Sequence, residues 1–79
     1  SGEAAEAERF LRQASAMRGA PAEARQNLAI ALALQGRFDE AEQIVRTDMP
    51  PAVAAQNVAY LRSLLRDERR WSDLEDGRR

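Results

Sequence analysis

Apolar residues recur at spacings of three and four along most of the chain, which is the spacing of an amphipathic helix. In segment 3–18 this spacing places on one face Ala7, Phe10, Leu11, Ala14 and Met17. Gly19 is placed to end the segment, and Pro21 suits the first turn of a following helix. The pattern therefore predicts a helix over 3–18 and a turn directly after it.

Segment 21–35 is apolar around most of its circumference, which is typical of a helix packed between two neighbours. One side carries Leu28, Ala31, Leu32 and Gln35. Another side carries Ile30, Ala33 and Leu34. Gly36 follows and is placed to end this second helix.

Two further helices are predicted over 38–48 and about 51–68, separated by Pro50 and Pro51, which break the chain. The residues of the first that are expected to face a core are Phe38, Ala41, Ile44 and Val45, together with Met49 just beyond the end of the segment. The second has one face made of Ala54, Val58, Leu61 and Leu65, with Tyr60 and Leu64 on the adjacent face. Apolar residues do not alternate with period two anywhere, so no sheet is expected. The predicted fold class is all-α, with four antiparallel helices in a right-handed solenoid fragment.

The end of the chain mixes charged residues around Trp71 and Leu74. A terminal aromatic residue commonly covers the end of a core, so we expect a capping turn or short helix here that frays after Gly77. The predicted organisation is a helical repeat domain over 1–70 and a capping turn with a frayed tail over 71–79.

An internal repeat relates residues 2–13 to residues 36–47, at a spacing of 34. The matching pairs are Gly2 with Gly36, Glu6 with Glu40, Ala7 with Ala41, Glu8 with Glu42 and Arg12 with Arg46. The pairs Glu8–Arg12 and Glu42–Arg46 are also four residues apart, an order that stabilises solvated helix faces slightly. The pattern indicates half a repeat, one full repeat and another half. Because such arrays need about three repeats, we expect the chain to be the C-terminal end of a longer protein.

Composition narrows the possible functions. Of the 79 residues, 16 are Ala, a strong helix former that lets helices pack closely. Cys and His are both absent, which excludes a disulfide framework, a thiol nucleophile, a His base and the common zinc sites. The adjacent carboxylates Asp39-Glu40 and Asp67-Glu68 lie on predicted surface turns, which is typical of solvated charge. We expect no enzyme activity, no metal and no cofactor.

Charge and hydropathy argue against nucleic acid and membrane-spanning functions. Twelve basic residues, all Arg, face 13 acidic ones, for a net charge of −1. A helix-turn-helix needs a basic recognition helix, yet segment 38–48 carries Arg46 among several carboxylates. No apolar stretch approaches the roughly 20 residues of a membrane-spanning helix, and no signal peptide is present. A protein partner is the remaining class.

Segment 28–45 resembles the tetratricopeptide repeat signature at Leu28, Ala29, Leu32, Gly36, Phe38, Ala41 and Val45. The resemblance implies that Ala29 and Ala41 meet where two helices cross, with Gly36 in the turn between them. Two positions depart from the signature. Arg25 stands in place of its first Trp, and Asp48 replaces its third small residue.

A closer resemblance covers about residues 22–65. It rests on Arg25-Gln26-Asn27-Leu28-Ala29, Leu34-Gln35-Gly36-Arg37-Phe38, Glu40-Ala41-Glu42, Asp48-Met49-Pro50-Pro51 and Asn57-Val58-Ala59-Tyr60-Leu61-Arg62. These segments resemble the C-terminal region of the TadD family of the tight-adherence (Flp) pilus machinery. The resemblance implies an outer-membrane lipoprotein that faces the periplasm and assists pilus assembly, with the secretin as partner. Lipidation in that family occurs on an N-terminal Cys, which this chain lacks, and the family has no catalytic motif.

Arrays of the tetratricopeptide type bind ligands on the concave face, which the first helix of each pair lines. The equivalent positions here are Gln26, Ile30, Ala33, Leu34, Gln56, Tyr60, Ser63 and Leu64. A clamp for a peptide carboxylate is not expected, because the chain has no Lys and apolar residues stand where polar ones would be needed. The apolar strip of Ile30, Leu34, Tyr60 and Leu64 suits an amphipathic helix or an extended segment. The alternative is that these four side chains only pack against one another between repeats.

Self-association is a further possibility. Segment 3–18 lacks the helix that would precede it in a full repeat, so its apolar face is expected to be exposed and to pair with a second copy. The candidate residues are Phe10, Leu11, Ala14 and Met17. The alternative to a pilus role is therefore a generic tetratricopeptide adaptor, or a self-association domain of another bacterial complex.

Overall fold

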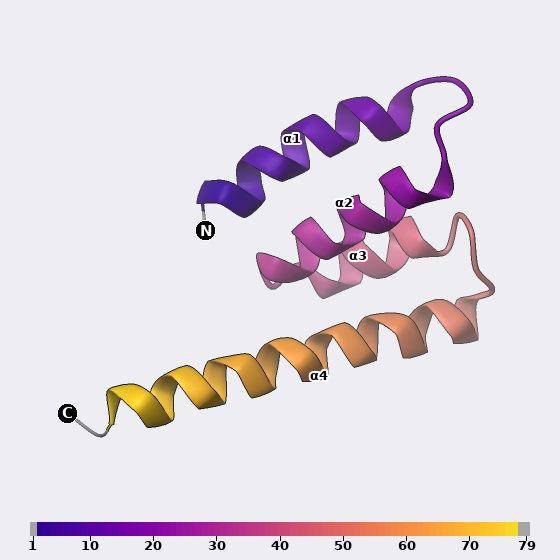
Figure 1. Ribbon diagram of the computed structural model, residues 1–79. Helices are drawn as coiled ribbons and strands as arrows, with labels where there is room; N and C mark the ends of the chain where they lie inside the picture. Colours follow the sequence, from indigo (N-terminus) through magenta and orange to yellow (C-terminus); the bar gives the residue numbers. More distant parts are fainter. Residues whose placement is uncertain (1, 78–79) are drawn as a thin grey trace.

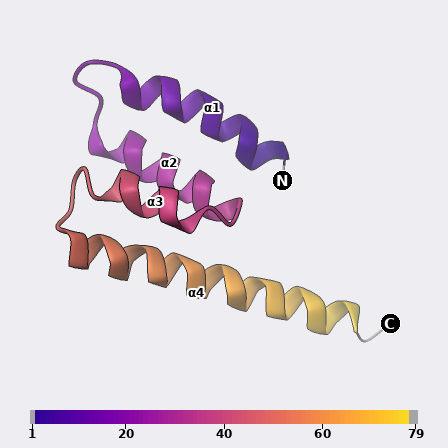
Figure 2. The same cartoon turned by 180° about the vertical axis from the view of Figure 1, so that it is seen from behind.

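The computed structural model describes residues 2–77 and contains four helices in antiparallel succession over that range (Figures 1 and 2). Their bounds are α1 Gly2–Ala16, α2 Ala22–Leu34, α3 Phe38–Val45 and α4 Pro51–Asp76. The described residues include no strand. The predicted all-α fold class is confirmed.

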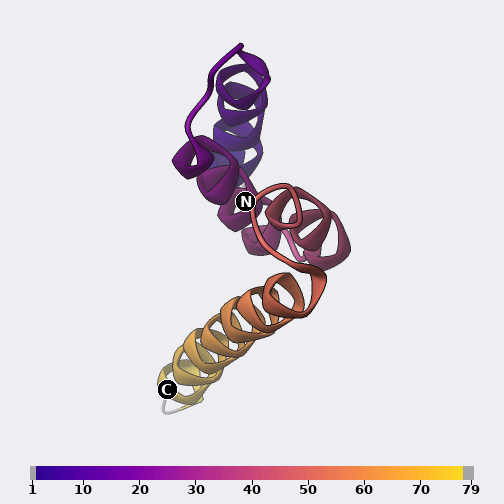
Figure 3. The ribbon, with the colours of Figure 1, turned by 90° about the vertical axis from the view of Figure 1, so that its right-hand side faces the viewer.

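The helices form an elongated stack of 51 × 28 × 16 Å. The pair α2 and α3 lies in the middle, α1 covers one side of it and α4 the other (Figure 1). Within the described chain α1 packs against α2 alone, whereas α4 contacts both α2 and α3. Turned by 90° about the vertical axis, the structure again has α1 above the α2–α3 pair and α4 below it, running away from the other helices (Figure 3). The two outer helices therefore each leave one flank uncovered.

Glycine ends α2 as the sequence predicts. Gly36 has φ +76°, a left-handed conformation that glycine adopts without steric cost. The amide of Gly36 donates to the carbonyl of Ala33 over 2.9 Å, and the amide of Arg37 donates to that of Leu32 over 3.0 Å. These two bonds satisfy carbonyls that the helix end leaves free and reverse the chain toward α3.

The core lies where α2 crosses α3 and α4. Its buried members are Leu28, Ala29, Leu32, Ala41, Val45, Ala54 and Val58, with Leu11, Phe38, Ile44 and Met49 packed around them. Ala29 and Ala41, the two small residues expected at the crossing, are both fully buried there. Their lack of bulk allows the two helix backbones to approach closely. The core-facing residues predicted for segment 38–48 are confirmed.

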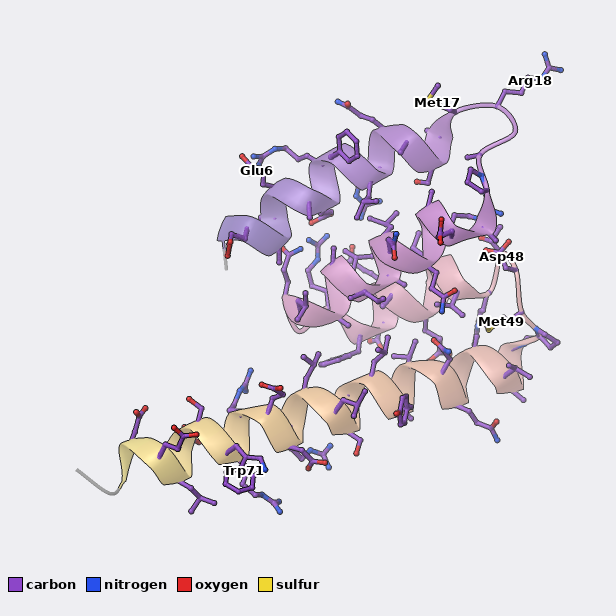
Figure 4. All side chains as sticks on the ribbon, viewed as in Figure 1. Glu6, Met17, Arg18, Asp48, Met49 and Trp71 are labelled. Atoms are coloured by element: carbon purple, nitrogen blue, oxygen red, sulfur yellow. The ribbon has the colours of Figure 1, made fainter. Side chains whose placement is uncertain are left out.

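The expected capping turn at the end of the chain is wrong for the described residues. Helix α4 continues to Asp76, eight residues beyond the predicted end at 68. Its last three turns carry no Gly or Pro, so nothing in the sequence interrupts the helix before Gly77. Trp71 lies on this extension and points away from the stack into solvent, covering no core (Figure 4). The frayed tail was predicted to begin after Gly77, and residues 78–79 lie outside the described range.

The apolar face of segment 3–18, which is predicted to be exposed, reaches solvent in part. Ala4 and Glu8 are the buried residues of α1, and Leu11 and Ala14 are half-buried. Phe10 and Met17 are exposed, and Met17 lies directly after α1 where the chain turns toward α2 (Figure 4). Two of the four residues expected on the exposed face are therefore exposed, and the other two are partly covered.

Candidate protein-binding surface

The four members of the apolar strip all reach solvent. Ile30 is 38 % exposed, Leu34 52 %, Tyr60 65 % and Leu64 44 %. Any mutual packing of these side chains between repeats therefore leaves part of each one open to solvent. The strip offers apolar area on α2 and α4, together with a phenol hydroxyl that can stay hydrated.

The other predicted positions on this face divide into two groups. Gln26, Gln56 and Ser63 are exposed. Ala33 is buried, contrary to its predicted outward position, because α2 is enclosed on that side by the turn into α3 and by α4. Ala33 therefore contributes to the floor of a groove and offers little contact area of its own.

A groove of about 460 Å³ separates α1 from α2. Ile30 and Leu34 of the apolar strip lie in its α2 wall beside Asn27, and the α1 wall is formed by Glu3, Ala4, Ala7 and Leu11. Half of the strip thus borders α1, a neighbour that the sequence prediction did not connect with it.

A second groove, of about 320 Å³, lies between α4 and the turn from α2 to α3; we call it the arginine groove. Leu34 and Phe38 line one side of it, and α4 contributes Arg62, Leu65, Arg66 and Arg69. The guanidinium of Arg62 stacks over the Phe38 ring at 5.2 Å from its centre. Sequence reasoning missed this site. The available signal was the spacing of the three arginines, four and then three residues apart.

Comparison with known families bears on the role of these surfaces. Residues 1–66 match a family model described as Tetratricopeptide repeat. The chain belongs to the tetratricopeptide repeat family. No curated protein and no solved structure matches it. Membership indicates a protein–protein interaction module, since domains of this family are typically non-catalytic.

The two departures from the tetratricopeptide signature compensate each other. Arg25, in place of the Trp, donates from Nε to Oδ2 of Asp48 over 2.9 Å and from Nη2 to Oδ1 over 2.7 Å. This two-bond pair joins the start of α2 to the turn before α4, where Asp48 lies next to Met49 (Figure 4). The hydrogen bond and charge of Arg25 lower the pKa of Asp48. An ion pair thus connects the two positions at which the chain departs from the signature.

Glu8 forms an ionic cluster that fastens α1 to the repeat unit. Its Oε2 accepts from Arg12 Nε over 2.8 Å, and its Oε1 accepts from Gln35 Nε2 over 3.0 Å and from Arg37 Nη1 over 2.6 Å. Arg37 also pairs with Glu40 at 2.6 Å. The expectation that Glu8 and Arg12 form only a solvated helix face is wrong, because Glu8 is 9 % exposed and also bonds Gln35 and Arg37 in the turn after α2.

The cluster changes the acidity of Glu8. Hydrogen bonds from Arg12 and then Gln35, with a further bond and charge from Arg37, lower the pKa of Glu8 from 4.5 to about 2, although its burial acts the other way. A carboxyl group that is more acidic in the folded chain stabilises the fold while ionised. This contribution is fully present above about pH 4.5 and is lost as pH falls through about 2.

We therefore expect Glu8→Gln to be less stable than wild type at pH 7, and the difference to shrink as pH falls from about 4.5 toward 2. The measurement is urea unfolding followed by circular dichroism across that range. Glu6→Gln is the matched control, since Glu6 lies on the outer side of α1 and the same charge is removed (Figure 4). Identical pH dependence in the two variants would show that the cluster does not stabilise the fold.

The described residues contain no group of three or more acidic, His or Cys side chains arranged to hold a metal ion. None of the helices in residues 2–77 has the length and apolar character required to cross a bilayer.

Proposed function

We propose that this chain is a non-catalytic interaction module that binds a segment of a partner protein along the apolar strip. The observation that carries the proposal is the exposure of Ile30, Leu34, Tyr60 and Leu64 on α2 and α4 of a tetratricopeptide repeat chain. Large apolar and aromatic side chains that solvent reaches on both helices provide the anchors on which peptide recognition depends.

We further propose that the partner belongs to the tight-adherence (Flp) pilus machinery. Support comes from the resemblance of about residues 22–65 to the TadD family, above all from Pro50-Pro51 followed by Asn57-Val58-Ala59-Tyr60-Leu61. On this proposal the module assists assembly of the secretin on the periplasmic side of the outer membrane. The secretin is the first candidate partner, and a peripheral pilus lipoprotein is the second.

Tyr60→Ala is expected to weaken partner binding by about 1–3 kcal/mol, the usual cost of removing an aromatic anchor. The measurement is affinity capture from the envelope of the source bacterium, followed by titration of the captured component. Phe10→Ala is the matched control, because Phe10 on α1 is 70 % exposed and Tyr60 on α4 is 65 % exposed. The double variant Tyr60→Ala, Leu34→Ala should keep its helical circular dichroism and lose capture.

Three outcomes separate the parts of this proposal. Capture of a pilus component by wild type and by Phe10→Ala, but not by the double variant, supports both the partner and the strip. Equal capture by all variants would contradict the strip and leave the pilus assignment standing. Capture of no envelope protein would overturn the pilus assignment, and the chain would then be a generic tetratricopeptide adaptor.

Self-association is a second candidate function, favoured by the exposure of Phe10 on α1 and of Met17 directly after it. These two side chains lie on the flank of α1 that α2 does not cover, whereas Leu11 and Ala14 of the same predicted face are half-buried. Sedimentation of wild type and Phe10→Ala distinguishes the two candidates. A wild-type dimer that Phe10→Ala converts to monomer would assign α1 to self-association.

A further inference from the structure

We propose that the arginine groove binds an acidic, extended segment of a partner protein, with carboxylates against α4 and apolar side chains against the opposite wall. The proposal deepens the proposed function, on which it rests for the class of partner. It assigns a chemical character to that partner, and it places the contact on a different flank of α4 from Tyr60.

The three arginines of the groove lie outside the ion pairs of the described chain. Four arginines, Arg12, Arg25, Arg37 and Arg46, each pair with a carboxylate. Across residues 2–77, Arg62, Arg66 and Arg69 form no salt bridge and no hydrogen bond with a side chain. Within residues 2–77, the guanidinium of Arg62 stacks on the ring of Phe38. The groove thus holds three positive charges without an internal counter-charge.

This arrangement is unfavourable in the free chain. Like charges three and four residues apart on a helix repel each other, and Arg62, Arg66 and Arg69 follow that spacing. The carboxylates that line the adjoining hollows do not neutralise the row in the described chain, because Glu40 is engaged by Arg37, and Asp39 and Asp73 make no ion pair with it. An anion in the groove would remove the repulsion and gain charge-assisted hydrogen bonds.

The spacing of the row fits an extended chain. With a rise of about 1.5 Å per helical residue, neighbouring arginines of the row are about 4.5–6 Å apart along the axis of α4. Side chains on one face of an extended peptide are about 6.6 Å apart. Such a peptide would direct alternate residues to the arginines and the intervening ones to Leu34 and Phe38 on the facing wall.

A short acidic segment fits the rest of α4 better than a nucleic acid. The chain has a net charge of −1, and Asp67, Glu68, Glu75 and Asp76 lie on the same stretch of helix as the arginines. An extended polyanion would approach these carboxylates as well as the arginine row. A peptide with a few carboxylates is confined to the row.

The test uses the full chain and a fluorescein-labelled ten-residue peptide with glutamates at three alternate positions and leucines between them. Fluorescence anisotropy should show saturable binding that weakens with added salt. A peptide with glutamine in place of each glutamate should bind at least about tenfold more weakly. The double variant Arg66→Gln, Arg69→Gln should lose a similar factor for the acidic peptide.

The matched control is Arg9→Gln, Arg18→Gln, which removes the same charge from exposed positions on α1 and the following turn, where Arg18 points into solvent (Figure 4). This control should bind the acidic peptide like wild type. An equal loss of peptide affinity in both double variants would mean that net charge alone causes the binding, and it would overturn the site. The absence of any binding by wild type would overturn it too. Tighter binding of a labelled single-stranded oligonucleotide would also overturn it.

Two further results separate this proposal from its neighbours. If wild type self-associates and Arg66→Gln, Arg69→Gln restores the monomer, the acidic segment belongs to a second copy and the proposal of a separate partner fails. If envelope capture depends on Tyr60 while the acidic peptide does not bind, the proposed function stands and the arginine groove is not its acidic-segment site.

Discussion

Leu32→Ala is expected to lower the free energy of unfolding by about 2–5 kcal/mol, because it removes a large side chain from the centre of the core. Leu32 is 0 % exposed and packs where α2 meets α3 and α4. The neighbouring core residues are mostly alanines and valines, which are too small to fill the space left by the leucine. A domain of this size is stable by only about 5 kcal/mol or somewhat more, so most of its stability depends on this side chain.

Urea unfolding monitored by circular dichroism measures the effect. Leu34→Ala makes the same chemical change two residues later on the same helix, at a position that is half exposed to solvent. It should cost less than about 1 kcal/mol, as surface substitutions generally do. Equal destabilisation by the two variants would mean that α2 does not bury the side that carries Leu32.

Ala41→Leu is expected to destabilise the chain by about 1–3 kcal/mol or more, although it adds apolar volume. Ala41 is fully buried where α3 crosses α2, opposite a helix whose own contact residue is Ala29. Three additional heavy atoms at this crossing would force the helices apart and separate the core that both helices share. Thermal unfolding should show a lower midpoint.

The control for this substitution is Ala55→Leu, which adds the same atoms at an exposed position of α4. It should leave the midpoint within a few degrees of wild type, the shift that corresponds to about 0.5 kcal/mol. An Ala41→Leu variant as stable as Ala55→Leu would contradict close packing of α2 on α3. The tetratricopeptide arrangement of these helices would then need revision.

The middle of the molecule is predictable from sequence because its signals are local and agree with one another. Gly36 ends α2 in the left-handed conformation that a glycine allows, and Pro51 opens α4. Ala29 and Ala41 are small residues at helical positions where the 34-residue period requires a close crossing. Each signal depends on a few neighbouring residues, and the family comparison points to the same architecture.

The ends of the molecule and the site were less predictable because their determinants are distant in sequence. The burial of Glu8 depends on Gln35 and Arg37, which follow it by 27 and 29 residues. Arg25 and Asp48 are 23 residues apart. The sequence marks each of them as a departure from the signature, but it does not indicate that they pair with each other. The arginine groove needs Phe38 and Leu34 opposite α4, a juxtaposition that helical periodicity does not contain.

The length of α4 illustrates a different limit. Charged residues surround Trp71, and an isolated aromatic at the end of a chain suggested a cap over a core. A solvated helix with the same residues satisfies the backbone hydrogen bonds equally well, and its aromatic residue does not have to pack on a core. Helix propensity favours this outcome, since ten of the sixteen residues from Leu61 to Asp76 are Leu, Arg or Glu and none is Gly or Pro.

Binding of a partner protein through α2 and α4 is the proposal on which the others depend. The most direct measurement is the amide ¹H–¹⁵N NMR spectrum of the labelled chain, recorded while the captured envelope component is added. The account predicts chemical-shift changes concentrated at Ile30, Leu34, Tyr60 and Leu64 and their neighbours, with the outer face of α1 around Phe10 and Met17 unchanged. Changes confined to that face of α1, with α2 and α4 unaffected, would contradict it.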